Sequence, residues 1–174
     1  MSDAKYLEMF PNWLASLGDD AVVLGQVLTS DASDDAKRNV ASGLNYIFKS
    51  LDLIPDGIDD LGFLDDAFVV RVAARLAVEE GGLSSDGPKR LAIEAEAVEE
   101  FLGETYARLV DYVRTLHKGA ARGRTVDDIL GEEGIRSSFL SELDAWSKAY
   151  ETPSFTREEK TLVKLRAFLS AKLA

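Results

Sequence analysis

The pattern of hydrophobic and polar residues along this chain is that of an α-helical protein. Val40, Leu44 and Ile47 recur at the three- and four-residue spacing that places side chains on one face of a helix. Residues 67–78, AFVVRVAARLAV, are apolar almost all round, as expected of a helix that other helices surround. The sequence therefore predicts a buried central helix spanning about residues 66–78.

Signals for helix starts indicate where several further helices begin. Ser33 is followed by two aspartates, the arrangement of an N-cap with acidic residues in the first turn. Asp19 and Asp20 are likewise predicted to cap a helix over residues 21–28. Residues 156–159, TREE, match a capping box ahead of a leucine-rich helix.

The remaining pattern predicts an all-α, compact bundle of about six to eight helices. An apolar seam runs through residues 88–116, and Gly103 is predicted to break or bend it. The glycine-rich stretch 119–125 is the predicted internal boundary. It separates a helical domain over residues 1–118 from a C-terminal helical segment over residues 119–174, which packs on it; one single domain is the alternative.

The composition fits a globular protein and limits its chemistry. Hydrophobic residues make up 46% and charged residues 29% of the chain, a balance that supports a packed core. There is no cysteine and one histidine, His117, so disulfides, thiolate zinc sites and multi-histidine metal sites within one chain are excluded. We interpret His117 as a cation that complements a helix C-terminus, with acid–base catalysis as the alternative.

Charge is distributed unevenly along the chain. The net charge is −11, and residues 1–66 hold thirteen acidic against four basic residues, which argues against nucleic-acid binding through this part. No secretion signal or membrane-spanning segment is evident, and we expect a cytoplasmic protein. The last helix is basic and amphipathic. It is predicted to dock on the acidic half of its own chain, with peripheral contact to an anionic membrane as the alternative.

The most unusual stretch is residues 50–66, SLDLIPDGIDDLGFLDD, which contains six aspartates. Pro55 cannot extend a preceding helix, Asp56-Gly57 is a turn pair, and Gly62 allows a positive φ. Six carboxylates in one stretch have three possible roles: structural caps and ion pairs, a metal site, or a polar binding pocket.

The structural interpretation accounts for the aspartates as caps and counter-charges. Asp52 is predicted to cap a short turn, and Asp65 or Asp66 to cap the buried central helix. Arg71 and Arg75 are the polar side chains of that helix and lie four positions apart, on one face. They are predicted to neutralise the motif aspartates inside the bundle.

The metal interpretation requires several carboxylates to converge. Clustered aspartates without histidine or cysteine suit hard cations such as Mg²⁺ or Ca²⁺. The spacing is not that of an EF-hand loop. The candidate ligands are Asp52 and Asp56 together with Asp65 and Asp66. On the structural interpretation no cofactor is expected.

The motif resembles that of the YkvA-like family, a bacterial domain-of-unknown-function family. DLIPD at residues 52–56 and GFLDD at residues 62–66 precede an apolar helix, and the resemblance covers residues 41–77. Ser50 and Asp59 replace two prolines of the family pattern. The resemblance implies a small helical domain, often in proteins with membrane segments, and no established reaction.

No constellation of a nucleophile with a base, histidine pair or phosphate-binding loop is evident in the sequence. We therefore predict a non-enzymatic binding or regulatory module that acts through an unidentified protein partner, in an unspecified oligomeric state. A carboxylate metal site and a peripheral membrane adaptor are the alternative functions.

Overall fold

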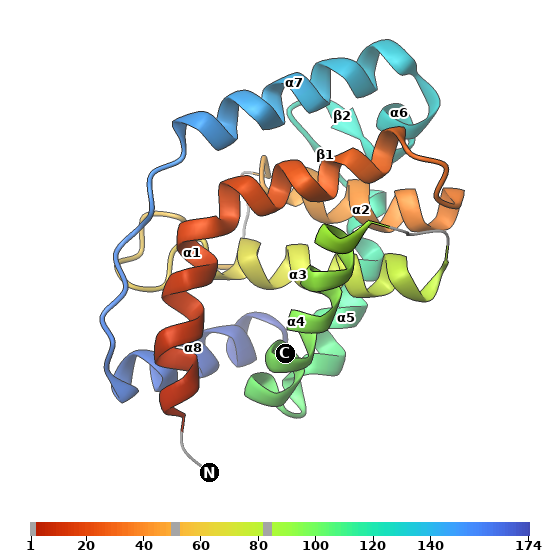
Figure 1. Ribbon diagram of the computed structural model, residues 1–174. Coiled ribbons are helices and arrows are strands. Elements are labelled where there is room, and N and C mark those ends of the chain that lie inside the picture. The colour runs from red at the N-terminus through yellow and green to blue at the C-terminus, as the bar shows by residue number, and fades with distance from the viewer. Residues whose placement is uncertain (1–2, 50–52, 82–84) are drawn as a thin grey trace.

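The computed structural model describes residues 3–49, 53–81 and 85–174, and the described residues form an all-α bundle (Figure 1). The α-helices are α1 Ala4–Gly25, α2 Asp34–Tyr46, α3 Leu64–Glu79, α4 Asp86–Leu102, α5 Thr105–Thr115, α6 Val126–Gly131, α7 Glu133–Ala149 and α8 Glu159–Lys172. The shorter elements are the 3₁₀ helices η1 Gln26–Thr29 and η2 Leu116–Lys118, and the strands β1 Ala120–Ala121 and β2 Arg124–Thr125, which pair antiparallel. The predicted fold class is confirmed.

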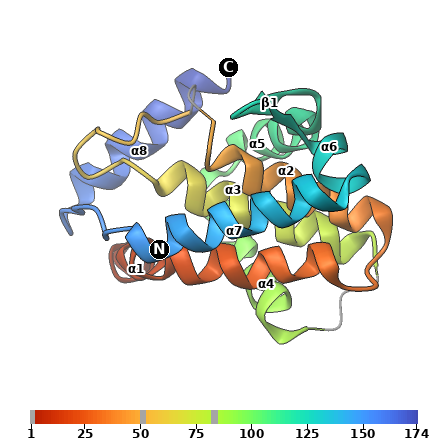
Figure 2. The ribbon, with the colours of Figure 1, turned by 90° about the horizontal axis from the view of Figure 1, so that it is seen from above.

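Helix α3 lies at the centre of the bundle, as predicted, and packs against α1, α2, α4 and α5 (Figures 1 and 2). Its side chains are buried on nearly every side. Gly43 allows α2 to cross α3 closely, because a Cβ at this position would overlap the Cβ of Ala73. The apolar sequence of α3 therefore reflects its position between several helices.

Two predicted helix starts are wrong, and one is confirmed. Ser33 caps α2 by accepting from the Ala36 N–H at 3.1 Å. Asp19 and Asp20 cap nothing, because α1 continues through them to Gly25, and Asp20 is instead buried in the bundle. Thr156 does not cap α8, which begins at Glu159 without a side-chain cap.

The seam over residues 88–116 is divided as predicted. Helix α4 ends at Leu102, Gly103 takes a φ of 57°, and α5 begins at Thr105. The stretch predicted as a boundary loop forms the short β1–β2 hairpin, followed by a capping box between Thr125 and Asp128 at the start of α6.

The C-terminal segment contributes to the same hydrophobic core as the rest of the chain. Phe139 of α7 and Leu165 of α8 are fully buried in it. Arg166 binds Asp3 through both terminal guanidinium nitrogens at 3.1 Å, and Arg157 binds Glu8 at 3.2 Å. Helix α8 thus docks on the acidic N-terminal part of its own chain, as predicted. Within the described residues, no helix is both long and apolar enough to cross a bilayer.

Candidate metal centre

The aspartate-rich motif forms a tight loop between α2 and α3, described from Leu53 to Phe63. We call residues 53–63 the motif loop. The Ile58 N–H donates to the Pro55 carbonyl at 3.1 Å, which confirms the predicted turn at Asp56-Gly57. A second turn follows, in which the Gly62 N–H donates to the Ile58 carbonyl at 2.9 Å.

Gly62 serves this loop in a different way from the predicted one. Its φ is not positive; instead, Asp60 and Phe63 take a φ of 68°. A Cβ at Gly62 would overlap the carbonyl oxygen of Asp56. Glycine is therefore needed because the two halves of the loop pack directly against each other.

The predicted caps of α3 are wrong. The residue that precedes the helix is Phe63, in the left-handed conformation and without a side-chain cap. Asp65 and Asp66 lie inside the first turn, where the helix dipole favours their charge. The predicted cap at Asp52 lies outside the described residues.

Asp65 is bound by side-chain and backbone donors from two other segments. Its Oδ2 accepts from the Tyr46 hydroxyl at 2.6 Å and from the Ile54 N–H at 3.3 Å. The Tyr46 hydroxyl accepts in turn from the Leu53 N–H at 2.6 Å. Asp65 therefore joins the end of α2, the motif loop and the start of α3.

Burial dominates the ionisation of Asp65. It raises the pKa of Asp65 to about 7, although the hydrogen bonds from Tyr46 and the Ile54 N–H lower it, and the charge of Asp56 raises it further. Burial also raises the pKa of Tyr46, so its hydroxyl keeps the proton that it donates to Asp65.

Three of the four predicted metal ligands converge. Asp56, Asp65 and Asp66 each offer a carboxylate oxygen, and these oxygens lie within 4.8 Å of one another. Asp65 and Asp66 are 1% exposed, whereas Asp56 faces solvent. The Oδ1 atom of Asp65 is buried and accepts no hydrogen bond among the described residues. The fourth candidate, Asp52, lies outside the described residues.

Tyr150 borders this cluster from the far end of the chain. Burial raises its pKa, and the charges of Asp66 and Asp56 raise it further. Its ring meets Phe63 edge to face with centroids 5.4 Å apart, and its hydroxyl donates to the Leu14 carbonyl at 2.7 Å. Tyr150, the residue that follows α7, therefore lies close enough to the cluster to feel its charge.

The predicted pairing of Arg71 with the motif aspartates is wrong. Arg71 is fully buried and binds Asp20 of α1 at 3.1 Å and Glu94 of α4 at 3.0 Å. Its guanidinium lies 4.1 Å from the ring centroid of Trp13. Asp20 also accepts from Arg90 at 2.6 Å. Arg71 thus projects toward α1 and α4, away from the motif loop.

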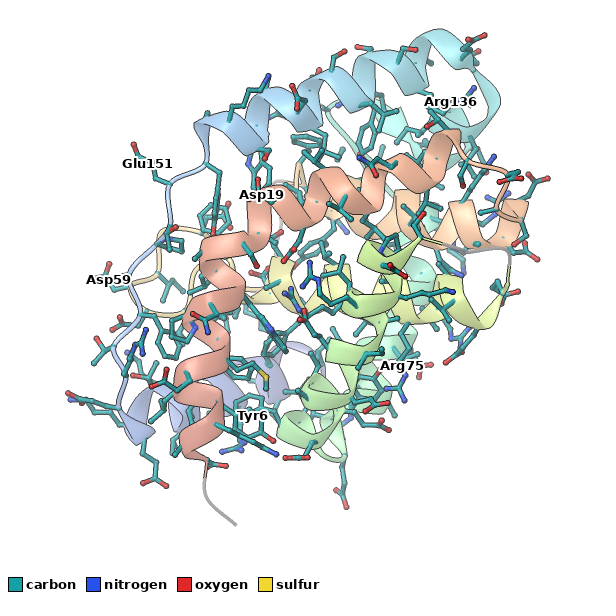
Figure 3. The ribbon with its side chains drawn as sticks, in the orientation of Figure 1. Tyr6, Asp19, Asp59, Arg75, Arg136 and Glu151 are labelled. Atoms are coloured by element: carbon teal, nitrogen blue, oxygen red, sulfur yellow. The ribbon has the colours of Figure 1, made fainter. Side chains whose placement is uncertain are left out.

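Arg75 also binds a partner outside the motif. It donates to Glu99 at 3.0 Å and to the Tyr106 hydroxyl at 3.1 Å, and its side chain is 30% exposed (Figure 3). Instead of pairing with the motif aspartates, Arg71 binds acids of α1 and α4, and Arg75 binds side chains of α4 and α5.

Tyr46 and Tyr150 lie at the candidate site and were not among its predicted residues. Tyr46 carried one usable signal, because a tyrosine hydroxyl within a buried apolar stripe needs a hydrogen-bond partner. Tyr150 gave no local signal, because its contacts with Leu14 and Phe63 join distant parts of the chain. His117 lies in η2, just after α5, with its Nδ1 2.7 Å from the Arg114 carbonyl oxygen, which can only accept a hydrogen bond.

Comparisons with protein-family models, with curated proteins and with solved structures found no match to this chain. The resemblance of residues 41–77 to the YkvA-like family stays a prediction.

Proposed function

We propose that this protein binds one hard divalent cation, Mg²⁺ or Ca²⁺, through Asp56, Asp65 and Asp66. The ion is part of a non-enzymatic helical module that acts by binding a protein partner. The observation that carries the proposal is the convergence of three carboxylates within 4.8 Å, two of them from buried residues.

The spacing of the carboxylates suits a single ion. Oxygen ligands lie about 2.0–2.6 Å from Mg²⁺ or Ca²⁺, so two ligands of one ion are at most roughly 4–5 Å apart. The 4.8 Å limit within the cluster meets this condition for Ca²⁺, whereas Mg²⁺ requires the oxygens to lie within about 4.2 Å of one another. Because all three ligands are carboxylates, the site favours hard cations over zinc or copper.

The burial of Asp65 supports a bound cation over a role as a cap. A buried carboxylate is costly unless its charge is compensated. Its Oδ2 has two hydrogen-bond donors, while its Oδ1 accepts no hydrogen bond among the described residues. A cation bound at the cluster would contact such an oxygen and offset the repulsion from Asp56.

The arrangement favours a structural or regulatory ion over a catalytic one. Asp65 and Asp66 are 1% exposed, so a substrate would have little access to an ion bound between them. Asp56 is the exposed member of the cluster, so an ion from solvent would meet this carboxylate first. In this position the ion would hold the motif loop against the first turn of α3.

Calorimetric titration of the chelator-treated protein with Mg²⁺ or Ca²⁺ tests the proposal. We expect one site, and a gain in unfolding free energy of about 2.7 kcal/mol at a hundredfold excess over Kd. Asp56→Asn should abolish both effects. This residue is exposed, so the variant should fold. Asp59→Asn is the matched control, because Asp59 is exposed on the same loop but outside the cluster (Figure 3).

The proposal fails if neither cation produces binding heat, or if the melting temperature rises no more than with NaCl at the same ionic strength. Equal losses of binding in Asp56→Asn and Asp59→Asn would also contradict it, because they would indicate diffuse attraction to an acidic surface in place of ligation.

A further inference from the structure

The segment that joins α7 to α8 is bound directly by the motif loop. We call residues 150–158 the strap. Asp60 of the loop accepts from the Thr156 N–H at 2.7 Å and from the Thr156 hydroxyl at 3.0 Å. In the opposite direction, the Asp60 N–H donates to the Ser154 hydroxyl at 3.3 Å. In Figure 3, Asp59 and Glu151 mark the loop and the strap on the same side of the molecule.

A second contact fixes the start of the strap. Tyr150 packs edge to face on Phe63, the residue immediately before α3, with ring centroids 5.4 Å apart. The Tyr150 hydroxyl donates to the Leu14 carbonyl of α1 at 2.7 Å. The strap therefore contacts both ends of loop segment 60–63. Asp60 binds Ser154 and Thr156, and Phe63 packs against Tyr150.

The loop connects the cation ligand to the strap through a short, tightly packed path. Asp56 lies in the first turn and Asp60 in the second, and Ile58 contributes to both, as donor in the first and acceptor in the second. Gly62 packs directly on the Asp56 carbonyl. Because these turns pack against each other, Asp56 and Asp60 lie in one closely packed unit of the loop.

We propose that the cation bound by Asp56, Asp65 and Asp66 controls the docking of the strap. This inference rests on the proposed function. With the ion present, Asp56 is drawn toward the first turn of α3 and Asp60 is held in place to bind Thr156. Without it, repulsion from the two buried carboxylates displaces Asp56, the exposed member, toward solvent, and the contact between Asp60 and the strap weakens.

The docked strap also forms part of a surface cleft. Asp60 and Thr156 line a cleft of about 630 Å³ along α8, together with Lys160, Lys164 and the exposed Val163. Release of the strap removes one wall of this cleft. The cation would therefore change the surface that the protein presents at α8.

Hydrogen exchange of the Thr156 and Asp60 amides, followed by NMR, measures strap docking directly, because each N–H donates across the loop–strap contact. Saturating Mg²⁺ or Ca²⁺ should slow both by at least about fivefold, the lower end of typical coupling between sites. The Glu132 amide, which donates to Asp128 at the end of α6, is the control and should not respond.

The coupling must be reciprocal, so loss of the strap contact must weaken cation binding by the same factor. Asp60→Gly removes the acceptor for Thr156, and glycine tolerates the φ of 68° at this position. Asp60→Asn removes the same charge but keeps a side-chain oxygen that accepts from Thr156. We expect the cation Kd of Asp60→Gly to exceed that of Asp60→Asn by about fivefold or more.

Each outcome is decisive. The proposed coupling fails if the cation binds but the two strap amides exchange at an unchanged rate. It also fails if the two Asp60 variants bind the cation equally. In both cases the proposed metal site is retained. If calorimetry detects no cation binding in the parent protein, the proposed function and the coupling both fall.

Discussion

Two buried aspartates in this protein are stabilised in opposite ways. Asp20 of α1 is 2% exposed and is bound by two arginines, Arg71 and Arg90. Asp65 of α3 is 1% exposed and is bound by a tyrosine hydroxyl and a backbone N–H. The first carboxylate has its counter-charge within the chain. The second has neutral donors, and its pKa is raised to about 7.

The charge of Asp20 is already compensated by arginines, whereas the environment of Asp65 suits an added cation. A buried ion pair gains Coulomb energy that offsets the loss of hydration, and removing one partner leaves a costly charge. A carboxylate with neutral donors is compensated only in part, and protonation or a bound cation completes it. The same residue type thus has a structural role at Asp20 and a proposed ligand role at Asp65.

The largest expected effect is at Arg71. Arg71→Met should lower the free energy of unfolding by about 3–5 kcal/mol, because Asp20 and Glu94 lose their shared buried partner. Urea denaturation at pH 7 measures the loss. Arg75→Met is the matched control on the same helix. Its ion pair with Glu99 is partly exposed, so it should cost no more than about 1 kcal/mol. Equal losses of unfolding free energy in the two variants would show that the buried network stabilises the fold no more than the partly exposed ion pair does.

The sequence predicted the bundle because its signals are local. The apolar character of residues 67–78 and the glycine at 103 are both visible within one or two turns of helix. The partners of the charged residues are not local. Asp20 and Arg71 are 51 positions apart, and the arginines on an apolar helix indicated only that some acid must be near. The motif aspartates, which are the acids nearest to Arg71 in the sequence, are not its partners.

The candidate site was predicted in part for the same reason. Aspartates close in sequence were expected to converge, and Asp56, Asp65 and Asp66 do. The prediction that Asp65 or Asp66 caps α3 failed because the helix already begins at Leu64, directly after Phe63 in its left-handed conformation. The contact between Asp60 and Thr156 spans 96 positions, and no local pattern indicates it.

The second largest expected effect is a pH-dependent change in stability caused by Asp65→Asn, measured in the presence of a chelator. The folded-state pKa of about 7 lies above the ordinary value of 3.8. Protonated Asp65 therefore contributes fully to the free energy of unfolding below about pH 4, and this contribution is lost as pH rises through about 7. Asp65→Asn removes this titration. Its stability relative to the parent should rise by up to ~4 kcal/mol between pH 4 and pH 8.

Urea denaturation across this pH range measures the difference between Asp65→Asn and the parent. Asp59→Asn, at an exposed acid on the motif loop, is the control and should show no comparable pH-dependent difference from the parent. A difference for Asp65→Asn that stays constant with pH would mean that Asp65 ionises like a solvated carboxyl group, and the contrast with Asp20 would be lost.

The smallest expected effect is at Tyr46, whose hydroxyl connects Asp65 to the Leu53 N–H. Tyr46→Phe should cost about 1–3 kcal/mol, because a buried N–H loses its acceptor and Asp65 loses a donor. The lost hydrogen bond lowers the pKa of Asp65 in the parent, so the cost should be larger at pH 8, where the carboxylate is charged, than at pH 5. Tyr6→Phe is the control, because the Tyr6 hydroxyl donates to the largely exposed Glu100.

If bound Mg²⁺ or Ca²⁺ removes the pH dependence of the Tyr46→Phe cost, then the cation stabilises the charge of Asp65 that the tyrosine only partly compensates. A pH dependence that persists unchanged at saturating cation would place the ion away from Asp65 and leave the two aspartates distinguished by their hydrogen bonds alone.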